Sequence, residues 1–415
     1  MTCCTAQTPC SSTCSAPDPR FAAEPLENLK GLALDDPRVP TPLFVIDDEK
    51  LEKNLRRARA RAAELGVAWR PHLKTHKSIG IALRQMTTPQ GPATVSTLAE
   101  ARYFGARGVT DIIYAVGIAP QKLAEVKRLR DLGVDLKIIL DSAEAARAVS
   151  AFCRENASTI PVLLEIDVDG HRSGIQPEGA ELLPAAEALT DGAVLKGVLT
   201  HAGDSYECKT VEAVQAAAEA ERAGILRAGI LRAAERLRKA GFAVGIISVG
   251  STPTLMFSKS EEGVTEMRAG VCSFFDLFMS NVGACSVDEI AGSVLATVIG
   301  RQVEKRRVIL DCGFLALSRD RGTSRQARDY GYGLVCDVNG TPLAGGTITL
   351  SGTNQEHGIL TLPEDSPLTQ EDFPVGLRLR ILPNHACPTA APYEKLVLVK
   401  NGRISEVLDH VRAWD

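Results

Sequence analysis

Residues 111–153 read DIIYAVGIAPQKLAEVKRLRDLGVDLKIILDSAEAARAVSAFC, and this stretch indicates the fold class. Short apolar runs at Asp111–Ala115 and Leu136–Asp141 predict buried strands. The longer segments that follow them, Pro120–Leu132 and Ser142–Cys153, predict helices. Strands that alternate with helices of this length are typical of a parallel sheet with helical crossovers.

The same alternation extends over residues 41–286. Further strands are expected at Thr41–Asp47, Val67–His72, Ala93–Ser96, Pro161–Asp167, Ala193–Thr200, Gly245–Gly250 and Thr265–Arg268, and further helices at Glu49–Leu65, Thr97–Phe104 and Val211–Lys239. About eight such units in roughly 250 residues predict a (β/α)8 barrel. An open doubly wound sheet is the alternative, but no GxGxxG sequence follows the first strand.

From residue 287 onward the sequence changes to strands separated by turns, with few helices. The expected strands are Leu295–Gly300, Arg307–Asp311, Thr347–Leu350, Leu377–Leu382 and Lys395–Val399. These features predict a β-rich second domain at residues 287–415, which residues 21–40 are expected to join. Residues 1–20 are rich in Thr, Ser and Cys and predict a disordered tail.

Composition excludes several classes of function. The 415-residue chain has a net charge of -4, so it offers no basic field for nucleic acid or an anionic membrane. No apolar run of about 18 residues predicts a membrane span. Of the eleven cysteines, four lie in the first fourteen residues and seven are scattered without a CxxC pair. This pattern favours a reducing compartment, so we expect the cytoplasm, with an organelle as the open alternative.

Polar motifs follow several of the expected barrel strands, where barrel enzymes carry their chemistry. In Arg70–Lys77 (RPHLKTHK), Lys74 is a candidate for a covalent bond to an aldehyde. In Asp169–Gly174 (DGHRSG), two glycines flank a turn that presents Arg172. Taken alone, Lys74 is better explained as one solvated lysine among many, and the segment with Arg172 is equally consistent with a surface turn.

Two later motifs offer groups for a ligand. Thr200–Tyr206 (THAGDSY) supplies His201 and Tyr206, although local hydrogen bonding and packing are the simpler explanation for both. The segment 248–254 (SVGSTPT) contains Gly250, Ser251 and Thr252. A Gly-Ser-Thr turn after a late barrel strand exposes backbone N–H groups and hydroxyls that bind phosphate.

The second domain carries two further motifs. In Pro383–Thr389 (PNHACPT), His385 and Cys387 are two residues apart, so both face the same side of an extended segment. Imidazole and thiolate together suit Zn²⁺ and tolerate other divalent ions. The alternative is a buried thiol beside a capping histidine. Gln355 and His357, in the NQEHG motif, are candidates for groups that support such a metal.

Eight motifs in this order resemble the D-serine dehydratase / D-threonine aldolase family, between about Thr41 and Val399. They are RPHLKTHK, DGHRSG, LTHAGDSYE, SVGSTPT, EMRAGVCSFFD, SRDRGT, NQEHG and PNHACPT. Members of this family are fold-type III pyridoxal-phosphate enzymes akin to alanine racemase. The resemblance implies an alanine racemase-like (β/α)8 barrel followed by a β domain, and a homodimer with active sites near its interface.

The resemblance also implies roles for individual residues. Lys74 resembles the Schiff-base lysine, Gly250–Thr252 the phosphate cradle, and Arg172 and Tyr206 the partners of the cofactor ring or its substituents. His385 and Cys387 resemble the ligands of a divalent metal. The implied cofactors are pyridoxal 5'-phosphate and Zn²⁺ or Mn²⁺, with Mg²⁺ as a further alternative.

The implied reaction acts on a D-3-hydroxy-amino acid, and its outcome stays open. Lys74 as general base and a metal that activates the 3-hydroxyl would give dehydration to a 2-oxo acid and ammonia. If His72 or His201 removes the hydroxyl proton instead, the Cα–Cβ bond breaks, as in an aldolase.

The resemblance favours dehydration. The His-x-Cys spacing and the SRDRGT and NQEHGIL segments are similar to the hydroxyaspartate dehydratase type, which acts on D-threo-3-hydroxyaspartate, with D-serine and D-threonine as further candidate substrates. D-threonine aldolase remains the alternative. A non-catalytic pyridoxal-phosphate-binding protein is disfavoured because such proteins generally lack a second domain.

Overall fold

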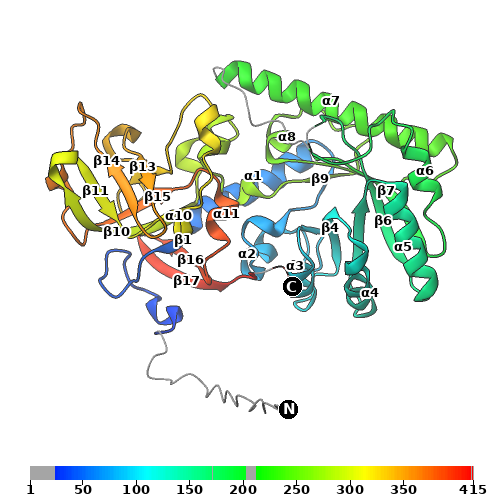
Figure 1. Cartoon of the computed structure of the whole chain (residues 1–415), viewed down its shortest axis with the longest axis horizontal. Helices are drawn as coiled ribbons and strands as arrows, with labels where there is room; N and C mark the ends of the chain where they lie inside the picture. Colours follow the sequence, from blue (N-terminus) through cyan, green and yellow to red (C-terminus); the bar gives the residue numbers. More distant parts are fainter. Residues whose placement is uncertain (1–23, 171, 202–211, 413, 415) are drawn as a thin grey trace, which may run out of the picture.

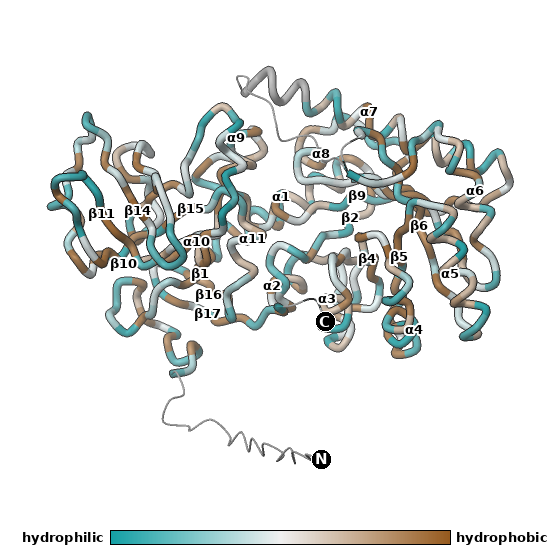
Figure 2. Tube along the Cα trace, in the orientation of Figure 1, coloured by the Kyte–Doolittle hydropathy of each residue, from teal (hydrophilic) through white to brown (hydrophobic). Residues whose placement is uncertain are grey.

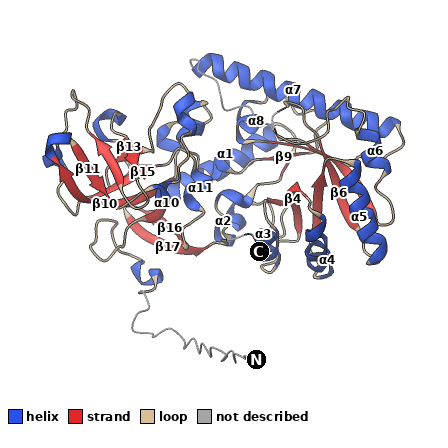
Figure 3. Ribbon diagram, in the orientation of Figure 1, coloured by secondary structure: helices blue, strands red, loops and turns tan. Residues whose placement is uncertain are grey.

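The computed structural model describes residues 24–170, 172–201, 212–412 and 414. Figure 1 shows two parts that lie side by side, a sheet wrapped in helices and a strand-rich part. In Figure 3 the helices α4, α5, α6 and α7 lie outside the strands of the first part, whereas the second part is built mainly from strands. This arrangement confirms the alanine racemase-like barrel and the β-rich C-terminal part that the sequence predicts.

The first part contains an eight-stranded parallel sheet in the order β2-β9-β8-β7-β6-β5-β4-β3. Its strands are β2 (Ala68–Trp69), β3 (Ala93–Val95), β4 (Asp111–Gly117), β5 (Asp135–Leu140), β6 (Ile160–Glu165), β7 (Ala193–Leu199), β8 (Ile246–Gly250) and β9 (Glu266–Arg268). All six residues of β6 are buried, and Figure 2 shows β5 and β6 as hydrophobic segments. Burial on both faces is the property of parallel strands covered by helices.

The two ends of this sheet meet. His72, just after β2, forms a parallel bridge with Thr94 in β3. The Thr94 N–H donates to the Pro71 carbonyl at 2.8 Å. Because β2 and β3 are the two outer strands of the sheet, this contact closes the barrel.

In the described part of the chain, eight helices accompany the barrel: α1 (Asp48–Glu64), α2 (Ile79–Gln85), α3 (Leu98–Gly105), α4 (Leu123–Asp131), α5 (Ala143–Glu155), α6 (Leu182–Glu187), α7 (Glu212–Lys239) and α8 (Thr252–Phe257). Side chains cap several of them. Thr97 accepts from the Glu100 N–H at the start of α3, and Ser142 accepts from the Ala145 N–H at the start of α5. None of the helices among the described residues combines the length and apolarity needed to cross a bilayer.

The second part is a nine-stranded sheet in the order β13-β14-β11-β10-β1-β16-β17, with β15 pairing with β10 and β12. Its strands are β1 (Leu43–Asp47), β10 (Gly292–Gln302), β11 (Arg307–Leu310), β12 (Leu334–Cys336), β13 (Leu350–Thr353), β14 (Gly358–Thr361), β15 (Arg378–Leu382), β16 (Lys395–Lys400) and β17 (Arg403–Asp409). Three short helices follow β9 in the described chain: α9 (Leu277–Asn281), α10 (Phe314–Leu317) and α11 (Ala386–Ala390).

Strand β1 differs from the expectation that the barrel begins at residue 41. It pairs antiparallel with β10 and parallel with β16, so it belongs to the second sheet. Phe44 and Ile46 pack into one apolar cluster and Leu43 and Val45 into another. A strand buried on both faces fits either a barrel or this sheet, so its hydrophobicity alone does not identify its partners.

Residues 24–40 lie against the β16–β17 hairpin. The Gly31 N–H donates to the Ile404 carbonyl at 2.7 Å, and Ala33 forms an antiparallel bridge with Arg403. The chain therefore enters along the second sheet, crosses to the barrel through α1 and returns to the second sheet at β10. This path holds the two parts together on both sides of the barrel sequence.

Candidate active site

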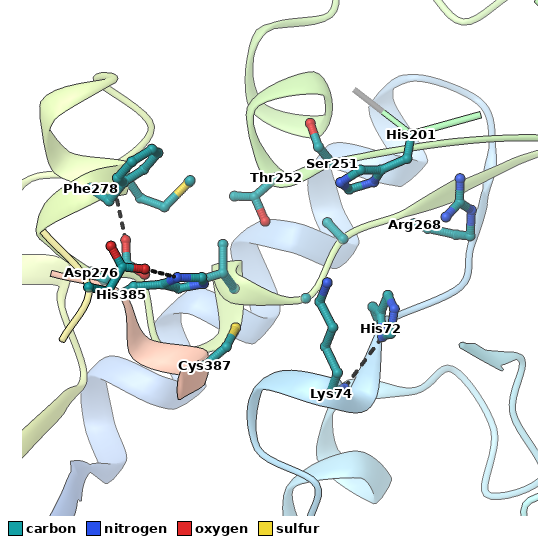
Figure 4. A pocket seen from close by; sticks show the side chains of 15 residues that line it. His72, Lys74, His201, Ser251, Thr252, Arg268, Asp276, Phe278, His385 and Cys387 are labelled. Atoms are coloured by element: carbon teal, nitrogen blue, oxygen red, sulfur yellow. Dashed lines mark hydrogen bonds and ion pairs between the residues drawn. The ribbon is translucent and has the colours of Figure 1, made fainter. Parts of the chain in front are cut away.

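A cavity of about 350 Å³ lies where the barrel meets the second part. From the barrel it is lined by His72, Lys74, His201, Ser251, Thr252 and Arg268. From segments beyond β9 it is lined by Asp276, Asp320, His385 and Cys387, among others. Figure 4 shows Asp276, His385 and Cys387 on one side of the cavity and the barrel residues on the other. The barrel residues follow the carboxyl ends of strands, the usual place for catalytic groups in this architecture.

Lys74 reaches the cavity from a short 3₁₀ turn, η3 (Leu73–Thr75), which follows β2. The His72 imidazole caps this turn, since its Nδ1 accepts from the Lys74 N–H at 3.4 Å. Leu73 and Thr75 are buried, whereas the Lys74 side chain extends into the cavity (Figure 4). The local fold thus separates one lysine from its neighbours and directs it inward.

The two barrel histidines are neutral. Burial lowers the pKa of His72 well below its ordinary value, and the positive charges of Lys74 and Arg268 lower it further. Burial and the same two cations also lower the pKa of His201. Both imidazoles are therefore available as proton acceptors rather than as fixed cations.

Ser251 and Thr252 line the cavity at the start of α8. Ser251 Oγ accepts from the Thr254 N–H at 3.2 Å, and Thr252 Oγ1 accepts from the Cys272 N–H at 3.2 Å. Gly250 also has a structural role. A Cβ there would lie 2.3 Å from the Arg268 carbonyl oxygen, so the glycine allows β8 to pack closely against β9.

Arg268 is a member of the site that sequence reasoning missed. Its side chain is buried at the end of β9. It donates from Nε to Ser248 Oγ at 2.8 Å and from Nη2 to the Thr200 carbonyl. Burial lowers its pKa to about 10, which still leaves a full positive charge at neutral pH. The available signal was a charged residue at the end of a buried strand inside the EMRAGVC motif.

His385 and Cys387 form the opposite side of the cavity, at the start of α11. His385 Nδ1 lies 2.8 Å from Asp320 Oδ2, and Cys387 Sγ lies 3.2 Å from Thr75 Oγ1. The second contact joins this segment to the turn that carries Lys74. The two motifs at opposite ends of the sequence are therefore adjacent in space.

The electrostatics of this pair oppose those of the barrel histidines. Burial alone would lower the pKa of His385, but the hydrogen bond to Asp320 and the proximity of Cys387 raise it well above its ordinary value. Burial alone would raise the pKa of the Cys387 thiol, but hydrogen bonding and charge interaction with His385 lower it. The pair thus favours a thiolate, the form of cysteine that binds metals.

Two carboxylates, also missed from the sequence, hold this segment. Asp320 belongs to the SRDRGT motif and accepts from the Gly322 N–H at 2.7 Å through Oδ1. Asp276 accepts from the N–H groups of Met279 and Ala386, both at 2.9 Å. Asp276 therefore caps α9 and fixes the backbone between the histidine and the cysteine.

These residues fit the cofactors that the sequence resemblance implies. For pyridoxal phosphate, the cavity offers a lysine amine, the hydroxyls of Ser251 and Thr252, and the buried cation Arg268. For a divalent ion, His385 and Cys387 supply nitrogen and sulfur donors. A carboxylate on the other ring nitrogen, as Asp320 provides, is the usual support of a metal-bound histidine.

A second cavity, of about 270 Å³, shares His72, Lys74, His201 and Arg268 with the first. Arg172 lines it, and its Nη2 lies 3.5 Å from Glu165 Oε1 at the end of β6. Burial raises the pKa of Glu165, and Arg172 opposes that effect. Arg172 is therefore near the predicted site, in a cavity that His385 does not line.

The remaining predicted residues lie elsewhere. Tyr206 falls outside the described residues. Gln355 and His357 lie in the exposed turn between β13 and β14, where the His357 carbonyl accepts from the Asn354 N–H at 2.8 Å. Neither is among the residues that line the cavity within the described chain. The His385 imidazole instead contacts Asp320.

Comparison with known proteins supports this arrangement. The chain matches the family "Alanine racemase, N-terminal domain" over residues 46–277 and the family "Putative serine dehydratase domain" over residues 291–399. It is 50% identical to D-threo-3-hydroxyaspartate dehydratase from Delftia sp. strain HT23, over 85% of this chain and 92% of that protein. It is 29% identical to D-threonine aldolase from Arthrobacter sp., over 92% of this chain and 97% of that protein.

Solved structures agree with the sequence matches. The structure of D-threo-3-hydroxyaspartate dehydratase from Delftia sp. HT23 superposes with a TM-score of 0.87 at 45% identity, covering 92% of this chain and all (100%) of that one. A cysteine-to-alanine variant of that enzyme, in the metal-free form, superposes with a TM-score of 0.86 over the same shares of both chains. The chain therefore belongs to the D-serine dehydratase / D-threonine aldolase family, the pyridoxal-phosphate-dependent lyases with an alanine racemase-like barrel.

Proposed function

We propose that this lyase dehydrates D-3-hydroxy-amino acids to a 2-oxo acid and ammonia, with D-threo-3-hydroxyaspartate as its preferred substrate. The observation that carries the proposal is that Lys74 and the His385–Cys387 pair line one cavity from two different parts of the chain. Such an elimination needs a base at Cα and assistance for a poor leaving group at Cβ. The 50% identity to a D-threo-3-hydroxyaspartate dehydratase supports the choice of substrate.

The barrel residues would perform the proton transfer. Pyridoxal phosphate, bound through Lys74, supplies an electron sink for the charge that develops at Cα. The Lys74 amine, once released by the substrate amine, would remove the Cα proton. Ser251 and Thr252 would hold the phosphate, while the buried Arg268 would hold an anionic group of cofactor or substrate.

The residues of the second part would hold a divalent ion, Zn²⁺ or Mn²⁺. Such an ion would act as a Lewis acid on the substrate 3-hydroxyl. His385 and Cys387 are the proposed ligands, and Asp320 would orient the His385 ring through Nδ1. The solved relative supports this assignment, because its cysteine-to-alanine variant is described in a metal-free form and a histidine-to-alanine variant two positions away was also studied. His385 and Cys387 have the same spacing.

Aldol cleavage is the competing outcome, and the identity to D-threonine aldolase favours it as the second candidate. In that reaction a base removes the 3-hydroxyl proton and the Cα–Cβ bond breaks. His72 and His201 are the candidate bases, because their lowered pKa values keep them neutral. Dehydration and cleavage would therefore use the same cavity and differ in which proton is removed.

Product analysis tests the proposal. The purified protein with pyridoxal phosphate and Zn²⁺ or Mn²⁺ would be incubated separately with D-threo-3-hydroxyaspartate, D-serine and D-threonine. We expect oxaloacetate and ammonia from the first substrate, with lower kcat/KM for the corresponding reactions of the other two. Glycine with glyoxylate or acetaldehyde would instead make the protein an aldolase. Protein that binds the cofactor but turns over none of these compounds would contradict both lyase proposals.

We also propose that the enzyme is a homodimer, as its family resemblance implies, and that it is cytoplasmic, as its cysteine pattern favours. In a dimer, Gln355 and His357 on the exposed β13–β14 turn would be available to a second chain. Light scattering on the purified enzyme tests the oligomeric state. A monomer with full activity would contradict the dimer and any role for these two residues in a partner's site.

A further inference from the structure

A cavity of about 210 Å³ lies in the strand-rich part and shares none of its described lining residues with the active-site cavity. It is bounded by the end of β1, by β15 and by the turn between β16 and β17. Its polar lining comes from Asp47, Glu49, Asn339, Arg380, Lys400 and Asn401. Its volume is below the roughly 300–1,000 Å³ of sites for drug-sized molecules, so it suits a smaller ligand.

Arg380 is the unusual member of this lining. It lies in the middle of β15 and is only 3% exposed. Its Nε donates to Ser293 Oγ at 2.8 Å. Within the described chain this is its one hydrogen bond, and it has no ion pair there, so Nη1 and Nη2 of this cavity-lining residue have no protein acceptor. A buried cation in this state is expensive unless a ligand or water supplies the acceptor.

Arg378, two residues earlier on the same strand, has a guanidinium that donates to several protein acceptors. It donates to Thr41 Oγ1 at 3.1 Å, to Thr297 Oγ1 at 2.9 Å and to the Val39 carbonyl at 2.8 Å. The strand therefore carries one arginine that the protein itself satisfies and one that it leaves open. The planar fork of Arg380 matches the two oxygens of a carboxylate.

Acidic side chains line the same cavity. Asp47 uses Oδ1 to accept from the Lys50 N–H at 3.0 Å at the start of α1, which leaves Oδ2 for another donor. Glu49 and Lys400 also line the cavity, and both residues are exposed. A simple anion on Arg380 would be repelled by Asp47 and Glu49. A ligand that carries a cation beside its carboxylate would satisfy both sides.

We propose that this cavity is a second binding site, for a small α-amino acid, with the carboxylate on Arg380 and the ammonium toward Asp47. The site is separate from the chemistry proposed for the active-site cavity, because none of its described lining residues lines that cavity. It would act as an effector or stabilising site. Glycine is a suitable probe, since it has both charges and no 3-hydroxyl group for a dehydratase to eliminate.

Thermal unfolding of the holoenzyme tests the proposal. Glycine, sodium acetate and methylammonium chloride would be titrated at constant ionic strength, so that the zwitterion is compared with each charge alone. We expect saturating glycine to raise the Tm of the wild type by about 2 °C or more, and the two single ions to raise it less. Binding of glycine at the active site would raise the Tm of all variants, so the informative quantity is the part that depends on Arg380.

The Arg380→Met variant should lose that part of the glycine effect. Without ligand its Tm should equal or exceed that of the wild type, because an unpaired buried charge has been replaced by an apolar group. Arg378→Met is the matched control. It removes a satisfied guanidinium from the same strand, so its Tm should fall while the glycine effect stays.

Two further variants keep the test decisive if Arg380→Met does not fold. Arg380→Lys retains the charge but not the two-pronged geometry, and should lose most of the glycine effect. Asp47→Asn retains a helix-capping side chain but not the charge, so the part of the glycine effect that depends on Arg380 should fall to that of acetate. A full glycine effect in Arg380→Met or Arg380→Lys would overturn the proposal. An equal Arg380-dependent effect of acetate and glycine on the wild type, or no such effect, would overturn it too.

Discussion

The two sides of the active-site cavity use the same residue type in opposite states. On the barrel side, His72 and His201 lie close to Lys74 and Arg268, and burial and these cations lower the pKa of both imidazoles. On the other side, the carboxylate of Asp320 and the Cys387 sulfur raise the pKa of His385. The neighbouring charges, rather than the imidazole itself, therefore decide whether a histidine in this cavity stays neutral or favours its protonated form.

The contrast assigns each side a kind of ligand. The barrel side carries two cations, and such a surface suits the phosphate and carboxylate groups of a cofactor and an amino acid. The opposite side carries two carboxylates, Asp276 and Asp320, and a thiol whose pKa is lowered. That surface suits a metal cation. Substitutions on the barrel side should therefore impair cofactor binding, and substitutions on the opposite side should impair metal binding.

The largest effect is expected for Lys74→Ala. The variant should lose the visible absorbance band of bound pyridoxal phosphate, and its lyase activity should fall by more than roughly 10⁴-fold, beyond the range for a general base alone. Lys77→Ala is the matched control, because the Lys77 ammonium pairs with Glu100 at 3.4 Å. It should keep the band. A full cofactor band in Lys74→Ala would contradict the assignment of Lys74 as the residue that binds pyridoxal phosphate.

Cys387→Ala should disrupt the proposed metal site without affecting cofactor binding. The cofactor band should persist, whereas the activity should fall by roughly 10²-fold or more and should not recover on addition of Zn²⁺ or Mn²⁺. Cys312→Ala tests for a general effect of losing a thiol, because Cys312 is buried in the second part and absent from the cavity lining. If Cys387→Ala retained metal-dependent activity equal to that of Cys312→Ala, the proposed metal site would be wrong.

Asp320→Asn should have a smaller effect on the same side. The His385 ring keeps a hydrogen-bond partner but loses the adjacent charge, so metal affinity should fall by roughly 10- to 100-fold. Titration of metal-stripped enzyme with Zn²⁺ or Mn²⁺, read by activity, measures this change. Asp329→Asn, which alters an exposed carboxylate paired with Arg321, should leave the titration unchanged. Equal affinities of the two variants would exclude the supporting role of Asp320.

The difficulty of finding Asp320 from the sequence illustrates what patterns reveal. Lys74, His385 and Cys387 were predictable because short motifs present them with chemically suggestive neighbours. Asp320 lies 65 residues before His385, and only the tertiary fold brings the two together. Gln355 and His357 are nearer in the sequence and have suitable chemistry, yet the structure has them on an exposed turn.

The fold, like the active site, could be predicted from the sequence only in part. Alternating strands and helices gave the barrel because their periods and lengths depend on local sequence. The membership of β1 depends on its partners β10 and β16, which lie about 250 and 350 residues further along the chain. Its four buried apolar residues, Leu43 to Ile46, are equally suited to either sheet. Pairing over such distances leaves no local signal.

The smallest expected effect concerns the pH dependence of stability and sharpens the contrast between the histidines. In the folded cofactor-free protein the pKa of His72 lies well below the 6.5 of an ordinary imidazole. As the pH falls below 6.5, the unfolded chain takes up a proton that the folded chain does not, so the free energy of unfolding decreases. His72→Gln should reduce this slope between pH 6.5 and 5 by up to about 1.4 kcal/mol per pH unit. Urea unfolding at several pH values measures it. Identical slopes for the variant and the wild type would mean that His72 is not held neutral by the barrel side.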